Sequence, residues 1–77
     1  MTKRETIIKI KDAYKNALYF ADIFQYKPFI RYYGEAQAWG EYLLEEFNTF
    51  LTEIDFLIEL ENECSAIYLN LEVYDEP

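Results

Sequence analysis

Carboxylate and phenol side chains are the reactive groups whose number and spacing in this sequence suggest a binding role. Glu41 and Glu45 lie one helical turn apart, Glu46 follows directly, and Tyr42 lies among them. Carboxylates accept charge-assisted hydrogen bonds from Arg and Lys, and the face of a tyrosine ring attracts a cation. The pattern indicates a surface that binds a basic protein, with these candidate residues: Glu41, Tyr42, Glu45, Glu46, Glu53, Glu59, Glu61 and Glu63.

Charge is divided unevenly along the chain. All seven basic residues lie within residues 1–31, whereas residues 32–77 hold twelve carboxylates and no Lys or Arg, and the net charge is −8. An acidic half of this density repels nucleic acid and membrane surfaces and attracts basic protein surfaces. In the alternative interpretation, the basic and acidic segments pair within the fold and the remaining acids confer solubility.

Catalytic and metal-binding chemistry has few candidates. The chain has no histidine, its one serine is Ser65, and its one cysteine, Cys64, has no neighbouring cation to lower its pKa. Glu59, Glu61 and Glu63 alternate, but a calcium loop needs a glycine turn that is absent here. We therefore predict no enzyme activity, no metal and no cofactor, and we expect Cys64 to be a buried apolar residue.

Helical periodicity dominates the first two thirds of the chain. A capping box, Thr2 to Glu5, precedes a first apolar seam, and a second apolar stripe runs through Gly34–Ile54. We predict that the first helix ends at Pro28, because proline disfavours helical geometry in the residue before it. The first seam consists of Ile7, Ile10, Tyr14, Ala17, Ala21 and Phe24, and the second stripe of Ala36, Gly40, Leu43, Phe47, Phe50 and Ile54, widened by Trp39, Leu44 and Leu51.

Two segments leave alternatives open. Residues 29–33 are either an extended connector or the first turns of the second helix, with Pro28 at the first helical position, and the unbroken apolar spacing favours the helix. Residues 55–74 fit an antiparallel hairpin at period 2. They also fit a helix in which Leu57, Leu60, Cys64, Ile67, Leu71 and Tyr74 form the seam.

These patterns predict one mainly helical domain over residues 1–77. The favoured architecture is a small three-helix bundle or helical hairpin, because the segment between the two halves of the possible hairpin lacks the usual glycine. The alternative is an α+β fold with two helices followed by a C-terminal β-hairpin at residues 56–74. The sequence shows no signal peptide or membrane-spanning run, and a single cysteine fits a reducing compartment, so we expect a soluble, cytoplasmic protein.

Fifteen aromatic residues are more than an interior of this size can hide. Tyr19, Phe20, Ile23 and Tyr26 lie on faces of the first predicted helix away from its seam, where they are available to pack against another molecule. One functional hypothesis is therefore a self-associating, homodimeric module with a structural or regulatory role.

The other hypothesis starts from the acidic half. In size, charge and aromatic content the chain is similar to small acidic inhibitors encoded by phages and mobile elements. Such proteins present their targets with a surface like the phosphate lattice of DNA or RNA. The similarity implies an inhibitor that binds a basic surface of a nucleic-acid-handling protein, such as a nuclease or a defence effector.

Overall fold

A computed structural model describes the backbone of residues 1–75 and the side chains of residues 1–71. It contains α1 (Lys3–Asp22), α2 (Tyr26–Phe47), the short 3₁₀ helix η1 (Leu51–Glu53) and α3 (Asp55–Asp75), with no strand in the described residues. The predicted three-helix bundle is confirmed. The alternative hairpin is absent, because residues 56–74 all lie within α3.

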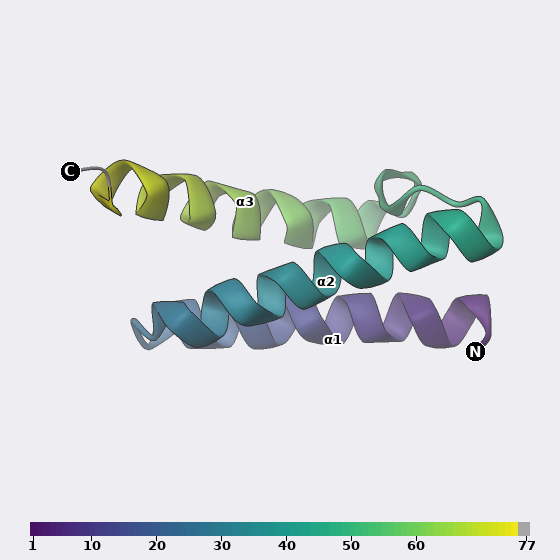
Figure 1. The fold of residues 1–77 in the computed structure, drawn as a ribbon, viewed down its shortest axis with the longest axis horizontal. Helices are drawn as coiled ribbons and strands as arrows, with labels where there is room; N and C mark the ends of the chain where they lie inside the picture. Colours follow the sequence, from purple (N-terminus) through teal and green to yellow (C-terminus); the bar gives the residue numbers. More distant parts are fainter. Residues whose placement is uncertain (76–77) are drawn as a thin grey trace.

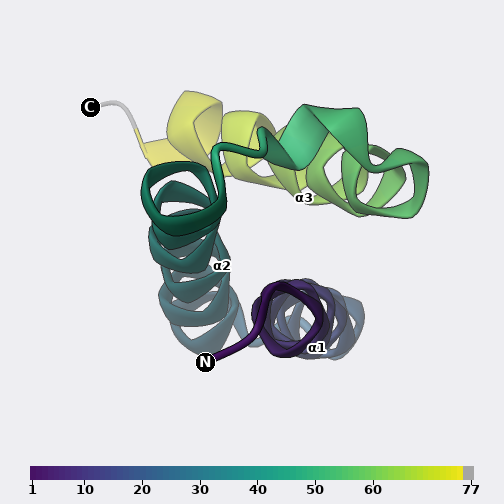
Figure 2. The same cartoon turned by 90° about the vertical axis from the view of Figure 1, so that its right-hand side faces the viewer.

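The three helices form an elongated bundle of about 40 × 20 × 18 Å. α1 and α2 run antiparallel beside each other, and α3 lies across the pair (Figures 1 and 2). The α1–α2 turn lies at one end of the long axis and η1 at the other (Figure 1). None of the helices in the described residues is long and apolar enough to span a membrane.

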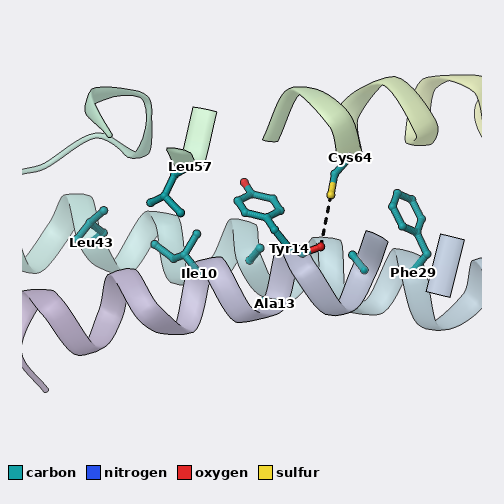
Figure 3. Close-up of a cluster of buried hydrophobic side chains, with 9 residues drawn as sticks. Ile10, Ala13, Tyr14, Phe29, Leu43, Leu57 and Cys64 are labelled. Carbon is teal, nitrogen blue, oxygen red and sulfur yellow. Dashed lines mark hydrogen bonds between the residues drawn. The ribbon is translucent and has the colours of Figure 1, made fainter. Parts of the chain in front are cut away.

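The core is a single row of side chains along the bundle (Figure 3). Small residues on α1 and α2 allow these two helices to pack closely, and the larger residues fill the space under α3. The buried apolar residues are Ile10, Ala13, Tyr14 and Ala17 of α1, Phe29, Ala36 and Leu43 of α2, and Leu57 and Cys64 of α3. The predicted burial of Cys64 is confirmed.

The predicted capping box starts α1. The Glu5 amide donates to Thr2 Oγ1 over 3.1 Å, and the Thr2 amide donates to Glu5 Oε1 over 2.9 Å. Two amide groups that the helix itself leaves without partners are thereby satisfied.

The end of α1 differs from the prediction, because the helix stops at Asp22 rather than at Pro28. The Gln25 amide donates to the Phe20 carbonyl and the Phe24 amide to the Ala21 carbonyl, which is a Schellman motif. This motif places Phe24 in the left-handed conformation, with φ 60°. Phe24 was expected in the seam, and it is instead 77% exposed.

The bounds of α2 also differ from the prediction. The helix begins at Tyr26, so that residues 29–33 are helical as favoured, with Pro28 at the third rather than the first position. It ends at Phe47, where Asn48 adopts a left-handed conformation with φ 49° that asparagine tolerates well. The end of the predicted stripe, Phe50, Leu51 and Ile54, therefore lies outside α2.

The apolar seam of α3 follows the helical prediction. Leu57 and Cys64 are fully buried, while Leu60, Ile67 and Leu71 are partly buried against the core. The side chain of Tyr74, the last predicted member, lies outside the described residues.

Gly34 lies inside α2, and a Cβ added there would meet nothing within 4 Å. We expect Gly34→Ala to raise the free energy of unfolding by about 0.5–1 kcal/mol, because alanine loses less backbone entropy in a helix. Urea unfolding followed by circular dichroism measures the change. Gly40→Ala is the control, since its Cβ would lie 3.1 Å from Leu51 Cδ1 and should gain less. A destabilising Gly34→Ala would contradict a continuous α2.

Candidate protein-binding surfaces

The α2 acidic surface consists of Glu41, Glu45 and Glu46 with Tyr42 among them. All three carboxylates are exposed, and Tyr42 is half-buried. The sequence contains no Lys or Arg after Arg31, so α2 itself brings no positive charge to this surface. Four of the eight predicted partner-binding residues are thus brought together on one helix.

A row of aromatic rings borders this surface. Tyr42 meets Trp39 edge to face with ring centroids 5.5 Å apart, and it meets Phe47 in the same manner at 6.2 Å. The Lys9 ammonium of α1 lies 5.5 Å from the Trp39 ring centroid. This cation–π contact brings one basic residue of α1 to α2.

Glu53 has a local structural role in addition to its predicted one. Its Oε2 accepts a hydrogen bond of 2.6 Å from the Phe50 amide, which caps the first turn of η1. The side chain is otherwise exposed at the bend between α2 and α3.

Glu59 and Glu63 lie on α3, away from the α2 acidic surface. Both are exposed, and they line a groove of about 310 Å³ together with Lys11 and Lys15 of α1. The groove therefore has carboxylates on one wall and ammonium groups on the other. At this place the basic and acidic halves face each other within the fold, as the alternative interpretation of the charge pattern expects.

Glu61 lies at the centre of a polar cluster that joins all three helices. Tyr14 of α1 donates to Glu61 Oε2 over 2.8 Å, and Gln37 of α2 donates to the same oxygen over 2.7 Å. Tyr33 of α2 donates to Glu61 Oε1 over 3.4 Å, and Gln37 also reaches the Tyr14 hydroxyl at 3.2 Å. We call Tyr14, Tyr33, Gln37 and Glu61 the Glu61 cluster.

The Glu61 cluster was not predicted as a unit. Tyr14 falls on the first apolar seam, and Tyr33 lies three residues before Ala36 and extends the spacing of the second stripe. A buried tyrosine hydroxyl needs a hydrogen-bond partner. Those two hydroxyl groups were the available signal in the sequence. Their acceptor was hidden because Glu61 is 47 residues from Tyr14 and 28 from Tyr33.

The environment of Tyr14, Tyr33 and Cys64 favours the protonated form of each side chain. Burial, and then the hydrogen bond to Glu61, raise the pKa of the Tyr14 phenol far above its ordinary value. Burial and the Glu61 charge also raise the pKa of Tyr33. Burial raises the pKa of the Cys64 thiol to about 12, so this thiol is not an ionised nucleophile at neutral pH. Within the described residues, no three Cys, Asp or Glu side chains lie close enough to hold a metal ion.

A second candidate surface surrounds the α1–α2 turn. Tyr19, Ile23 and Tyr26, three of the four predicted self-association residues, are exposed, Tyr19 by 60% and Ile23 by 46%. The fourth, Phe20, is half-buried and stacks on Tyr32 of α2 with ring centroids 5.6 Å apart. Two further exposed apolar residues that the prediction missed complete what we call the turn-end patch: Tyr19, Ile23, Phe24, Tyr26 and Ile30.

Comparison with known protein families, curated proteins and solved structures finds no match for this chain.

The Glu61 cluster generates a stability prediction. We expect Glu61→Ala to lower the free energy of unfolding by about 2–3 kcal/mol, because donors on α1 and α2 lose a shared charged acceptor. Glu63→Ala, two residues away and exposed, should change it by no more than about 0.5 kcal/mol. Urea unfolding of both variants measures the difference. Equal effects would show that the cluster contributes no more than an exposed charge.

Proposed function

We propose that this protein is a non-catalytic binding module whose α2 acidic surface engages a basic surface of a nucleic-acid-handling protein, such as a nuclease or defence effector, and inhibits it. The observation that supports this most is the exposure of Glu41, Glu45 and Glu46 on a helix that carries no basic residue after Arg31. The other predicted carboxylates have neighbours inside the fold: Glu61 in its cluster, Glu53 in its cap, and Glu59 and Glu63 opposite two lysines.

The spacing of the α2 acids supports nucleic-acid mimicry. An α-helix rises about 1.5 Å per residue, so Glu41 and Glu45 are separated by about 6 Å along the axis. Alternate phosphates on one strand of duplex DNA are separated by roughly 7 Å along its axis. A groove that binds a phosphate backbone through Arg and Lys therefore meets charges at a comparable interval on α2.

The charge arrangement also sets the kinetics of the proposed complex. Complementary charge steers two proteins together and raises the association rate, and salt screens this attraction. The screening length falls from about 8 Å at 0.15 M salt to about 3 Å at 1 M. Binding through the α2 acidic surface should therefore be fast and should weaken as salt rises.

Reversal of the α2 charges tests the proposal. We expect Glu41→Lys, Glu45→Lys and Glu46→Lys together to abolish capture of partners from a lysate of the host. The melting temperature of the isolated protein should stay unchanged or rise, since like charges one turn apart repel each other. Partners captured by the parent protein should be released by high salt and displaced by added duplex DNA, because the proposed surface occupies a nucleic-acid groove.

A matched control distinguishes the effect of the α2 acidic surface on binding from the effect of net charge. The triple variant Asp12→Lys, Asp22→Lys and Glu35→Lys reverses three exposed carboxylates outside the predicted binding residues, with the same change in net charge. This control should still capture the partner. Retention of the partner by the α2 variant, or equal loss in both variants, would contradict a specific role for the α2 acidic surface.

Self-association is a second candidate function, and the turn-end patch favours it. Five exposed apolar residues lie within twelve positions of the chain, at one end of the bundle. Exposed apolar residues concentrated in one short segment are typical of protein interaction sites. The homodimer would have a structural or regulatory role, with the acidic residues keeping it soluble.

Sedimentation at micromolar concentration tests self-association. We expect a dimer that Ile23→Asp converts to a monomer, because a charge would be buried in an apolar contact. Phe20→Asp should also disrupt it, but through lost stacking on Tyr32 as well. The dimer should persist at about 1 M salt, unlike the complex with a basic partner. A parent chain that is monomeric throughout would exclude this candidate.

A further inference from the structure

Phe24 combines the greatest exposure among the large apolar residues of the described chain with an unfavourable backbone conformation. It is 77% exposed and has φ 60°. It occupies the position of the Schellman motif that usually holds glycine, because a side chain there crowds the backbone. A bulky residue at such a position is a genuine outlier, and strain of this kind is concentrated at functional sites. Glycine would form the same turn with less strain, so the turn itself does not explain the phenylalanine.

A groove lies between α1 and α3, and its lining includes Asp22 and Tyr26, which flank Phe24 in the chain. Its volume is about 450 Å³, which is within the range of protein sites that hold compact ligands. The α1 wall runs along residues 15–22 and leads to the turn, and Ile67 of α3 forms part of the opposite wall. The apolar residues that line it are Leu18, Tyr19, Ala21, Tyr26 and Ile67.

We propose that a second copy of this chain occupies the groove, with Phe24 of each copy inserted between α1 and α3 of the other. The inference rests on self-association, the second candidate function, and names the contact that produces it. A twofold dimer requires one patch to carry both halves of the contact. The α1–α2 turn meets this requirement, because it carries the exposed Phe24 and because Asp22 and Tyr26, on either side of Phe24 in the chain, both line the groove.

The charges around the groove support a second copy as the occupant. Lys15, Asp22 and Glu63 line it, and Lys27 is exposed just beyond the turn. This region therefore carries both signs, whereas the whole chain carries −8. Because both signs are present, two copies can meet here across a twofold axis with the lysines of one copy facing the carboxylates of the other.

Phe24→Gly separates the contact from the fold. Glycine relieves the left-handed conformation, so helical content should be kept, and the melting temperature measured at a dilution where the parent is monomeric should stay unchanged or rise. The same change should weaken the dimer by roughly 30-fold, as expected for a central aromatic anchor. Phe50→Ala is the matched control and should leave the dimer intact. Phe50 is an exposed aromatic directly before η1, which lies at the opposite end of the bundle.

Photo-crosslinking locates the inserted ring. Phe24→p-benzoylphenylalanine in one copy is mixed with a heavy-isotope-labelled parent chain, and the crosslinked peptides are identified by mass spectrometry. We expect crosslinks between the two copies at Leu18, Ala21 or Ile67 of the groove.

The two experiments distinguish the insertion of Phe24 from self-association in general. A dimer that Phe24→Gly dissociates, with crosslinks in the groove, supports the insertion. A dimer that survives Phe24→Gly, or that crosslinks elsewhere, overturns the insertion and leaves self-association standing. A chain that stays monomeric, whether its groove is empty or holds a small molecule or another protein, overturns both. The α2 acidic surface is tested independently of all three results.

Discussion

The arrangement of this bundle depends on the hydrogen bonds that converge on Glu61. Apolar contacts hold helices together without direction, so a short bundle can slide or rotate at little cost. The Glu61 carboxylate accepts from Tyr14 on α1 and from Tyr33 and Gln37 on α2, which sets the rotation and register of α3 over the other two helices. A half-satisfied polar group in that position would be costly, and this cost disfavours other registers.

The carboxylates of the acidic half have different roles in the folded protein. Twelve carboxylates in residues 32–77 look alike in the sequence, but the fold gives them different surroundings. Glu61 is a half-buried acceptor, Glu53 is a helix cap, and Glu59 and Glu63 line a groove with lysines of α1. The surplus of negative charge on α2 is then confined to a small surface at its C-terminal end, and the proposed basic partner is directed to that surface.

The two candidate surfaces differ in their position and in the interactions through which they would bind. The α2 acidic surface lies in the half of α2 that leads to η1, whereas the turn-end patch lies at the opposite end of the bundle (Figure 1). One depends on charge and is weakened by salt, and the other depends on apolar burial and is not. Because the two surfaces do not overlap, a dimer formed through Phe24 would present two acidic surfaces, one at each far end. Such a dimer would bind a two-site basic partner more tightly than a single copy.

Local sequence patterns favoured the helical class and predicted the capping box at Thr2 and most of the buried seam residues, because periodicity and capping depend on residues a few positions apart. Phe24 and Phe50 are the exceptions, since both were expected in seams and are exposed. The ends of α1 and α2 were predicted less well. Phe24 and Asn48 follow the two helices in left-handed conformations. Glycine or asparagine usually occupies this position, so a phenylalanine in the sequence does not indicate that a helix ends beside it. Only the tertiary structure decided that Glu61 is a half-buried acceptor shared by three helices while Glu41 is exposed. That difference depends on partners 24 to 47 residues away, which no local pattern contains.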